Sequence, residues 1–377
     1  MHRRLALLLP LLALGGCATL DDFFASIKKG GDSGPVAYED RPIEEPIAPN
    51  NFLLAHAEQS VVGEPQVVFA RDQDTLSDLA REYGLGYDEI VAANPEVDPW
   101  LPGENTPILL PTQYVLPNVP KEGVVLNIAT KRLFYFPEVA DGEQQEVLTY
   151  PIGIGRVGWE TPLGSTSVVS KAKDPQWWVP ASVRREHAEM GDPLPAVVPP
   201  GPDNPLGTRV LKLDMPGYLI HGTNQPYGVG MRVSHGCVRL YPENIELLYA
   251  FVSVGEPVMI INEPYQIGQQ DGVLYFEAHA PLDDDVVSPA ERLQALLDEQ
   301  VDMSGRPLND HLQNHIRSLA ELPSGLPVSI VMYDADEYVA RARVVQNTVE
   351  TDPDALTLAE IREMMDDEVD DDDQESL

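Results

Sequence analysis

Two histidines and one cysteine lie close together in a single segment of this 377-residue chain. His221 precedes Cys237 by sixteen positions, and Ser234, His235 and Gly236 stand directly before the cysteine. A thiol attacks an acyl carbon effectively only as a thiolate, so it needs a nearby base. A histidine can supply that base, and a glycine permits a tight turn and the close approach of a substrate carbonyl. The segment therefore predicts acyl transfer by a cysteine nucleophile.

Each residue of this segment has an expected role. His221, at the end of an apolar run, takes the thiol proton and later exchanges a proton with the incoming or leaving amine. Its second ring nitrogen needs an acceptor, which a backbone carbonyl near Gly222 or a carboxylate can provide. The backbone amides from His235 to Cys237 are candidates for an oxyanion hole. We expect Ser234 to orient His235.

The same residues also allow a purely structural interpretation. A histidine at a strand end is commonly a packing residue, and a buried cysteine is commonly inert. A metal site would require three or four convergent ligands, and the segment offers only His221, His235 and Cys237 as obvious ones. The residues around Cys237 also differ from those of a papain-like protease. We expect neither a metal nor another cofactor.

The first residues are typical of an export signal. Residues 1–4 are basic, residues 5–14 are apolar but too few to span a bilayer, and two glycines precede Cys17. The Leu-Gly-Gly-Cys sequence resembles the lipobox of bacterial lipoproteins, in which the cysteine is acylated and becomes the first residue of the mature chain. The resemblance implies a signal peptide over residues 1–16 and a lipid anchor on Cys17. It implies the periplasm of a Gram-negative bacterium, at the outer membrane because Ala18 follows the cysteine.

If Cys17 carries a lipid, Cys237 is the one free thiol of an exported protein, which favours a reactive role. An ordinary secretory signal or a short anchor helix is the alternative. The net charge of −36 repels nucleic acid and anionic lipid surfaces, so we expect no nucleic-acid partner. The same acidity also confers solubility or tolerance of salt.

The composition indicates an α+β chain of folded units and connecting segments. Residues 17–65 are rich in Gly, Pro, Asp and Glu and are predicted to form a flexible linker. Two folded units, residues 66–112 and 123–263, are followed by a smaller α/β extension over residues 264–345. Residues 346–377 keep a short helical pattern, end in an acidic run and are predicted to be largely disordered.

Residues 66–112 show a βααβ pattern. Val67–Phe69 and residues 107–111 are predicted strands, Thr75 can cap a first helix, and a second helix ends at Asn94. This order, with the sequence QDTLSDLAREYG, resembles the LysM module, which binds N-acetylglucosamine-containing glycans such as peptidoglycan. A small helical spacer is the alternative.

Residues 123–263 are predicted to be mostly β. The expected strands are 124–128, 133–136, 147–154, 167–171, 209–212, 218–221 and 257–261, with one helix at 243–252. The Pro-rich segment 192–205 is expected to form a lid or wall beside a cleft. In the extension we expect strands at 273–278, 328–333 and 339–345, and helices at 289–300 and 309–319.

The segment around the cysteine resembles the L,D-transpeptidase (YkuD) family, whose mark is a His-Gly pair followed by [Ser/Thr]-His-Gly-Cys. These residues are His221 and Gly222, followed by Ser234, His235, Gly236 and Cys237. The resemblance covers residues 67–345, includes TPLG at 161–164, and implies a mostly-β catalytic domain. It implies that Cys237 is the nucleophile, that His221 is the proton donor and acceptor, and that the three residues before the cysteine shape the pocket.

The resemblance also implies substrate contacts at Gly222, Thr223 and Arg239. Many members have Asn two places after the cysteine, and Arg239 in its place offers a cation to a stem-peptide carboxylate; a structural salt bridge is the alternative. In the implied reaction, Cys237 attacks the carbonyl before the terminal D-Ala of a tetrapeptide stem, D-Ala leaves, and an amine resolves the thioester.

The implied partners are peptidoglycan stem peptides and glycan strands, a wall-linked outer-membrane lipoprotein, and the membrane through the lipid anchor. Members of the LysM-bearing branch either attach such a lipoprotein to peptidoglycan or form 3-3 cross-links, and the acceptor amine stays open. Two alternatives remain: an amidase that releases wall-bound lipoprotein, and a non-catalytic tether between outer membrane and peptidoglycan.

Overall fold

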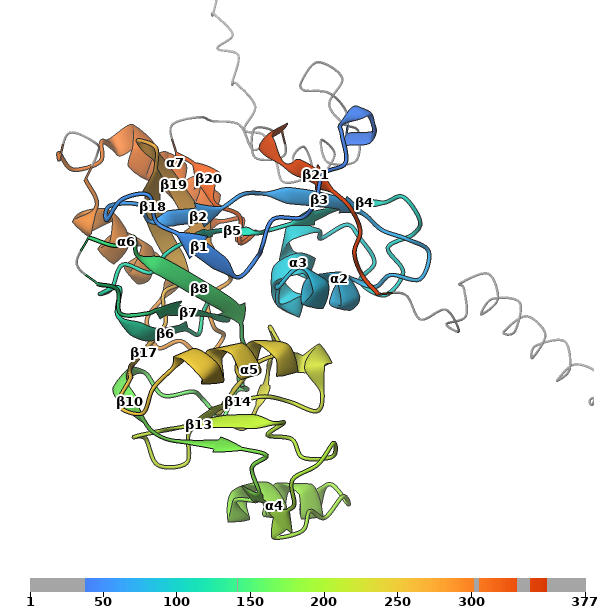
Figure 1. Cartoon of the computed structure of the whole chain (residues 1–377). Helices are drawn as coiled ribbons and strands as arrows, with labels where there is room; N and C mark the ends of the chain where they lie inside the picture. Colours follow the sequence, from blue (N-terminus) through green and yellow to red (C-terminus); the bar gives the residue numbers. More distant parts are fainter. Residues whose placement is uncertain (1–37, 141, 302–304, 331–339, 351–377) are drawn as a thin grey trace, which may run out of the picture.

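The structure is a computed structural model that describes residues 38–140, 142–301, 305–330 and 340–350 (Figure 1). The predicted signal peptide, Cys17 and the acidic residues after Glu350 lie outside the described residues. Within the described part of the chain, no helix has the length and apolar character needed to cross a bilayer.

A nine-stranded sheet forms the centre of the molecule, in the order β1-β8-β7-β6-β17-β10-β13-β14-β16. These strands are β1 (Asn51–Leu53), β6 (Gly123–Asn127), β7 (Arg132–Phe136), β8 (Glu146–Pro151), β10 (Gly164–Lys173), β13 (Arg209–Leu213), β14 (Leu219–His221), β16 (Val238–Arg239) and β17 (Pro257–Ile261). Every strand expected between residues 123 and 263 is present. The expected strand 147–154 divides into β8 and β9 (Ile154–Gly155), because Gly153 leaves β8 to pair with Arg239.

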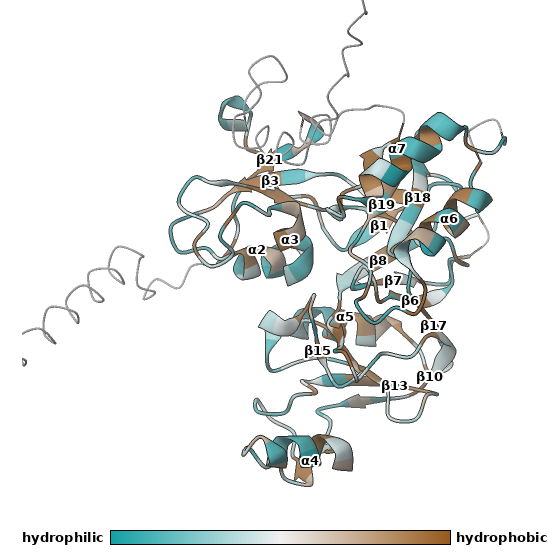
Figure 2. Cartoon of the chain, turned by 180° about the vertical axis from the view of Figure 1, so that it is seen from behind, coloured by the Kyte–Doolittle hydropathy of each residue, from teal (hydrophilic) through white to brown (hydrophobic). Residues whose placement is uncertain are grey.

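The central strands are buried on both faces. Alternate residues of β6 and β7 belong to two different cores, so every position of these strands is buried. One core contains Val124, Leu126 and Leu133 together with helix α5 (Pro242–Phe251). Side chains of the opposite face, Val125, Phe134 and Phe136, pack against the first helix of the N-terminal unit. Burial on both faces explains why these strands are continuous apolar runs (brown in Figure 2).

The N-terminal unit (residues 66–112) has the predicted βααβ order. Its elements are β3 (Gln66–Phe69), α2 (Leu76–Glu82), α3 (Tyr87–Ala93) and β4 (Pro107–Leu110). Thr75 caps α2 as expected, because its side chain accepts a hydrogen bond from the Asp78 amide while the Asp78 carboxylate accepts one from the Thr75 amide. Asn94 ends α3 and holds β4 through its side chain, which bonds both the amide and the carbonyl of Leu109.

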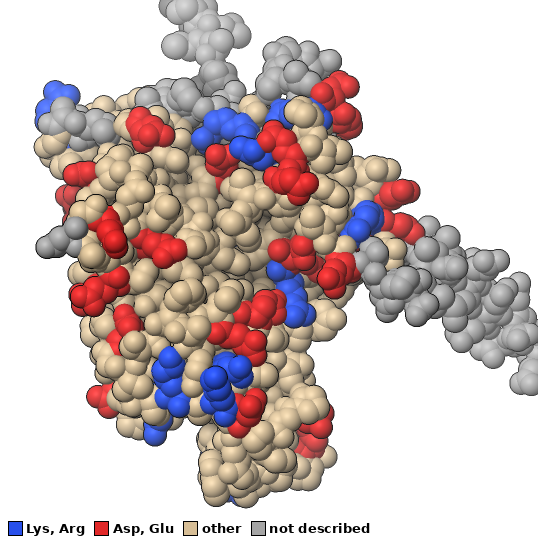
Figure 3. All heavy atoms as spheres, viewed as in Figure 1, with Lys and Arg blue, Asp and Glu red and all other residues tan. Residues whose placement is uncertain are grey.

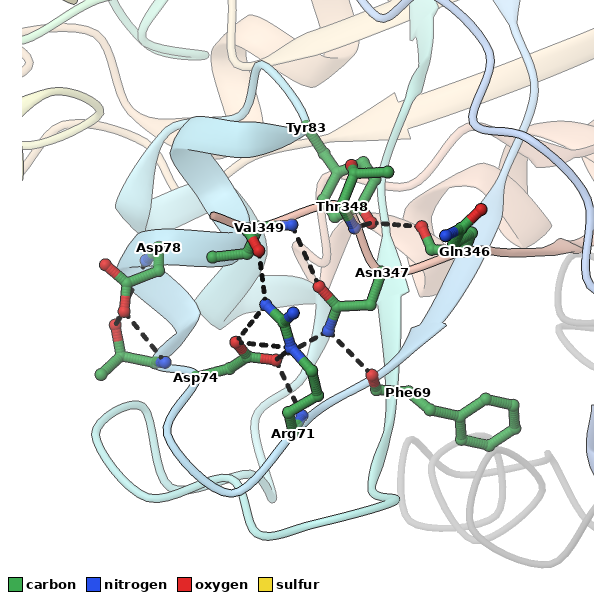
Figure 4. Close-up of polar contacts among 10 residues, drawn as sticks. Phe69, Arg71, Asp74, Asp78, Tyr83, Gln346, Asn347, Thr348 and Val349 are labelled. Carbon is green, nitrogen blue, oxygen red and sulfur yellow. Dashed lines mark hydrogen bonds and ion pairs between the residues drawn. The ribbon is translucent and has the colours of Figure 1, made fainter. Parts of the chain in front are cut away.

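The end of the described chain returns to this unit. Strand β21 (Arg343–Val345) pairs in parallel with β3 and completes the three-stranded sheet β21-β3-β4. Beyond it, the side-chain amide nitrogen of Asn347 donates to the Phe69 carbonyl at 3.0 Å and to the Asp74 carboxylate at 2.7 Å (Figure 4). The Arg71 side chain donates to the Val349 carbonyl at 2.7 Å. The tail of residues 346–377 was predicted to be largely disordered, and this prediction does not hold for residues 346–349, which make these contacts. Residues 346–349 are mostly polar, so the sequence gives no sign of contacts that form only when the chain is folded.

The prediction of a flexible linker is also wrong for its described part, residues 38–65. β1 extends the main sheet by pairing with β8, and β2 (Val61–Gly63) pairs with β5 (Gln113–Val115). A 3-10 turn at Tyr38–Asp40 buries its tyrosine. Each strand has only three residues, so its apolar pattern is too short to stand out among prolines and acidic residues, yet an existing sheet edge can hold it.

The extension after residue 263 packs two helices on a three-stranded sheet. The strands are β18 (Tyr265–Gln270), β19 (Val273–Ala278) and β20 (Val328–Ser329), and the helices are α6 (Pro289–Glu299) and α7 (Asp310–Ala320). Both helices and two strands lie where expected, whereas β18 was not predicted. Apolar side chains of α6 and α7 join Phe276 in a separate core.

A long excursion between β10 and β13 contains a helix that the sequence analysis missed. The excursion runs through β11 (Trp177–Trp178), α4 (Ala181–Glu189) and β12 (Val197–Val198). β11 pairs with β12, and the buried amide of Asn204 donates to the carbonyls of Pro175 and Pro199. The excursion thus forms a closed lobe, which projects at the bottom of Figure 1. Its helix escaped prediction because it buries only Val183.

Candidate functional site

Two adjacent parallel strands bring His221 and Cys237 together. β14 and β16 pair with Ile220 beside Val238 and His221 beside Arg239. Ile220 and Val238 both point into the core beneath α5. Side chains alternate along a strand, so His221 and Arg239 project from the opposite face. Cys237 directly precedes β16 and lies two positions before Arg239. The alternation of side chains along a strand predicts that its side chain lies on the same face as His221.

His221 is held as a neutral base. Its side chain is 3% exposed, and its Nδ1 lies 2.6 Å from the Gly222 carbonyl oxygen. Since a carbonyl only accepts, Nδ1 carries the proton and Nε2 has the free lone pair. Burial, helped by the nearby Arg239 charge, lowers the pKa of His221 to about 3, although the bond to Gly222 opposes the shift. The backbone carbonyl expected to hold this imidazole is therefore present.

Cys237 is a free, half-buried thiol. Its Sγ donates to the Gly217 carbonyl at 3.6 Å. Burial raises the pKa of Cys237, while a backbone hydrogen bond at Leu219 and the charge of Arg239 act in the opposite direction. The resting pair is thus a thiol and a neutral imidazole, and the S–H must turn from Gly217 toward His221 to be deprotonated.

Arg239 offers a positive charge beside the thiol. Its Nε is buried and has no hydrogen-bond partner, and within the described residues no carboxylate is among the groups that shift its pKa. Burial lowers the pKa of Arg239, and the neighbouring Cys237 acts to raise it. The structural salt bridge considered as an alternative is therefore not formed among the described residues.

The turn before the cysteine is closed by Ser234 and Thr161. Ser234 Oγ donates to the Cys237 carbonyl at 2.5 Å and accepts from the Gly236 amide at 3.2 Å. Thr161 Oγ1 donates to the Gly236 carbonyl at 3.0 Å. Ser234 therefore fixes the turn and does not orient His235, contrary to our expectation. The Gly236 amide is engaged in this network, which leaves the other amides of the turn as oxyanion-hole candidates.

Gly236 is required by its backbone conformation and its neighbours. Its φ of +98° lies in the region that favours glycine. A Cβ at this position would lie 3.0 Å from Tyr218 Cε1 and 3.4 Å from the carbonyl oxygens of Trp159 and Glu160. The turn that presents Cys237 is thus packed between Tyr218, next to β14, and residues 159–160, which the sequence analysis did not connect with it.

Gly222 and Thr223, the two other residues expected to contact substrate, make hydrogen bonds within the loop after β14. The Gly222 carbonyl accepts from His221, and Thr223 is 4% exposed with its hydroxyl oxygen accepting from the Gln225 amide at 2.9 Å. A Cβ at Gly207, where the excursion ends, would lie 2.8 Å from the Thr223 amide nitrogen. The backbone at the exit from β14 therefore packs closely on Gly207.

His235 is held by residues that the sequence analysis missed. Its Nε2 lies 2.9 Å from Glu186 Oε2, on α4, and 3.2 Å from an Arg156 nitrogen. Arg156 also forms an ion pair with Glu186, and the Trp159 ring meets His235 edge-on at 4.9 Å between ring centroids. Glu186 lies in residues 180–207, a segment that resembles one branch of the family, but the resemblance gave it no role. Arg156 lies in no recognisable motif. Among the described residues, no group of three or more His, Cys, Asp or Glu side chains is arranged to hold a metal ion.

Comparison with known proteins finds the same catalytic domain in curated relatives. The family model of the YkuD L,D-transpeptidase catalytic domain matches residues 121–260. The probable L,D-transpeptidase YcfS of Escherichia coli (strain K12) is 35% identical over 294 residues, which are 76% of this chain and 89% of that protein. The probable L,D-transpeptidase ErfK/SrfK of Salmonella typhimurium is 37% identical over 306 residues, 78% of this chain and 93% of that protein. The probable L,D-transpeptidase YbiS of Escherichia coli (strain K12) is 42% identical over 226 residues, 59% of this chain and 72% of that protein.

Proposed function

The chain belongs to the L,D-transpeptidase family and carries its YkuD catalytic domain, and from this premise we propose that it transfers acyl groups of peptidoglycan stem peptides through a thioester on Cys237. One observation carries the proposal. His221 is held as a neutral base by the Gly222 carbonyl and pairs with Arg239 across β14 and β16, and the free thiol of Cys237 directly precedes β16.

The proposed reaction has two half-reactions. Cys237 Sγ attacks the carbonyl carbon between diaminopimelate and the terminal D-Ala of a tetrapeptide stem, while its proton passes to His221 Nε2. The C–N bond then breaks, and His221 returns the proton to the departing D-Ala amine. An acceptor amine attacks the thioester, loses a proton to His221, and forms the new amide as the S–C bond breaks and the thiol is restored.

Arg239 is proposed to bind a carboxylate of the stem peptide. The support is its position beside Cys237 and its buried Nε without a partner. A guanidinium that finds its carboxylate only on substrate binding gives a charge-assisted bond in a partly dry site. Backbone amides of His235 and Cys237 are proposed to hold the oxyanion of the tetrahedral intermediate.

The N-terminal unit is proposed to be a LysM module that binds the glycan strand of the same polymer. Its βααβ order and capped first helix support this assignment. We further propose, from the sequence alone, that residues 1–16 are a signal peptide and that Cys17 is lipidated. The enzyme would then act from the outer membrane in the periplasm, where its acceptor is either diaminopimelate, giving 3-3 cross-links, or an outer-membrane lipoprotein.

The test uses purified enzyme with disaccharide-tetrapeptide muropeptides and a labelled D-amino acid as acceptor. We expect Cys237→Ala to abolish exchange with an unchanged melting temperature, and His221→Ala to lower the rate by about 10²–10⁴-fold. The exposed His56→Ala should behave as wild type. Exchange retained by Cys237→Ala would overturn the proposal. Release of stem peptide from lipoprotein without exchange would indicate the amidase, and an inert thiol would indicate the non-catalytic tether.

A further inference from the structure

The strongest cluster of charged groups that the proposed mechanism does not use surrounds His235. Glu186 places one carboxylate oxygen on Arg156 and the other 2.9 Å from His235 Nε2. His235 Nε2 can donate to this carboxylate or accept from the Arg156 guanidinium, which lies 3.2 Å away, so the tautomer of the ring selects one of these two contacts. Arg156, whose amide donates to the Ser234 carbonyl at 3.0 Å, is itself attached to the same turn. Glu186 therefore closes a ring of contacts around the turn before the nucleophile.

The groups facing His235 come from three segments. They are Glu186 and His187 of α4, Arg156 and Trp159 of the loop after β9, and Arg239 of β16. Burial lowers the pKa of His235, the hydrogen bond to Glu186 raises it, and Arg156 and Arg239 lower it. The net direction is downward, so His235 is neutral near pH 7. The hydrogen bond of Arg156 keeps the pKa of Glu186 below its ordinary value, so the carboxylate stays charged.

Glu186 lies on the lobe formed by the excursion between β10 and β13. The excursion is closed on itself by the pairing of β11 with β12 and by the buried Asn204. Figure 3 shows this lobe projecting below a body on which acidic and basic side chains are interspersed. The carboxylate of Glu186, with its side chain 26% exposed, joins the lobe to the turn that carries Cys237. Its loss would remove this link and leave the ring contact between His187 and His235, at 6.2 Å between centroids.

We propose that Glu186 is a positioning residue for the reaction at Cys237: by bridging Arg156 and His235 it holds the nucleophile turn in shape and keeps α4 beside it. This inference rests on the proposed function, because it assigns Glu186 a part in that reaction. Gly236 alone separates His235 from Cys237, so a displaced imidazole shifts the thiol relative to His221. A misplacement of about 1 Å is enough to cost on the order of 10²-fold in rate.

The experiment compares Glu186→Ala and Glu186→Gln with Glu189→Gln, a fully exposed glutamate on the same helix. Full-length protein is measured for kcat and KM of muropeptide exchange, for the rate of Cys237 alkylation by iodoacetamide, and for melting temperature. We expect Glu186→Ala to lower both kcat and the alkylation rate about 10- to 100-fold with KM little changed. Glu186→Gln keeps an oxygen for His235 but loses the charge facing Arg156. Its kcat and alkylation rate should lie between those of wild type and Glu186→Ala. Glu189→Gln should match wild type.

Two results would overturn the inference. One is a Glu186→Ala variant within twofold of wild type in both kcat and alkylation rate. The other is a loss of rate that only follows a loss of folded protein, seen as a lowered melting temperature. If wild type is alkylated but performs no exchange, the proposed function fails, and the alkylation rates of the variants still decide the role of Glu186.

Discussion

The reactive pair at Cys237 is uncharged at rest. Burial keeps the pKa of His221 at about 3 and raises that of Cys237 above its ordinary value of 9.0. At pH 7 the imidazole can accept a proton and the thiol still has one to give. The proton therefore moves during attack on the substrate, and His221 acts as a true general base. This arrangement differs from a preformed thiolate–imidazolium pair, in which the cysteine pKa would be depressed.

The pH dependence of alkylation tests this state directly. Below the pKa of Cys237 the thiolate fraction rises tenfold per pH unit, so the rate of reaction with iodoacetamide should climb steadily from pH 6 to 9. His221 stays neutral across this range, so its protonation adds no further step to the pH profile. A plateau beginning below pH 7 would contradict the uncharged pair. Cys237→Ala provides the blank for labelling elsewhere.

Gly236 provides a second test at this scale. Gly236→Ala would strain a backbone at φ +98° and press its Cβ against Tyr218 at 3.0 Å. We expect a cost of about 1–3 kcal/mol in unfolding free energy and at least a tenfold loss of exchange rate. Gly272→Ala is the matched control, since its φ is +78° and nothing lies within 4 Å of its Cβ. That variant should lose some stability in chemical denaturation but keep its activity per folded molecule.

At the scale of elements, the N-terminal unit is built into the catalytic sheet. Glu89 of α3 forms a buried ion pair with Arg132 of β7 at 2.8 Å, and Arg132 also donates to the Gly84 carbonyl. Beside this pair, Gly86 packs directly on Gly230 of the loop between His221 and Cys237, where a Cβ at Gly86 would lie 2.7 Å from the Gly230 Cα. The unit that is proposed to bind glycan is thus in contact with the loop that carries the catalytic pair.

The buried pair gives a measurable prediction. Glu89→Ala leaves the Arg132 charge buried without its partner and should lower the unfolding free energy by about 3–5 kcal/mol. The neighbouring Asp88 pairs with Lys131 at 3.1 Å but is 42% exposed, so Asp88→Ala should cost less than about 1 kcal/mol. Urea denaturation distinguishes the two. Equal effects would show that the interface depends on apolar packing and not on this pair.

At the scale of the whole molecule, the two ends of the described chain meet on one unit. β21 adds a strand to the sheet of the N-terminal unit, and Glu44 forms an ion pair with Arg343 in that strand. Residues 346–349 then cross the loop between β3 and α2 (Figure 4). The N-terminal unit, predicted from the sequence as residues 66–112, is therefore completed by residues near the other end of the described chain.

Asn347 tests how much this closure contributes. Asn347→Ala removes the bonds to the Phe69 carbonyl and Asp74 and should lower the unfolding free energy by about 1–3 kcal/mol. It should also speed hydrogen exchange at the β3–α2 loop more than in the main sheet. Thr348→Ala is the control, because its exposed side chain leaves the backbone bond to Tyr83 intact. Identical behaviour of the two variants would mean that the terminal segment adds no stability.

The sequence by itself determined the catalytic motif and most of the elements. The motif is one continuous segment, Ser234-His235-Gly236-Cys237, so it can be recognised from the sequence without a structure. The strands and helices that hold them repeat apolar residues at short periods, which is why β6, β7, β10 and α5 were predicted close to their observed bounds. The short strands β1, β2 and β18 and the helix α4 bury too few side chains to create such a pattern.

Only the tertiary structure decided which groups act on the motif. Glu186 lies 49 positions from His235, Arg132 lies 43 from Glu89, and Asn347 lies 273 from Asp74. Hydrogen bonds and ion pairs across such separations leave no periodic trace in the chain, because a single polar side chain is compatible with either solvent or a distant partner. The chemistry of the site is local in sequence, whereas its support is set by how remote segments pack.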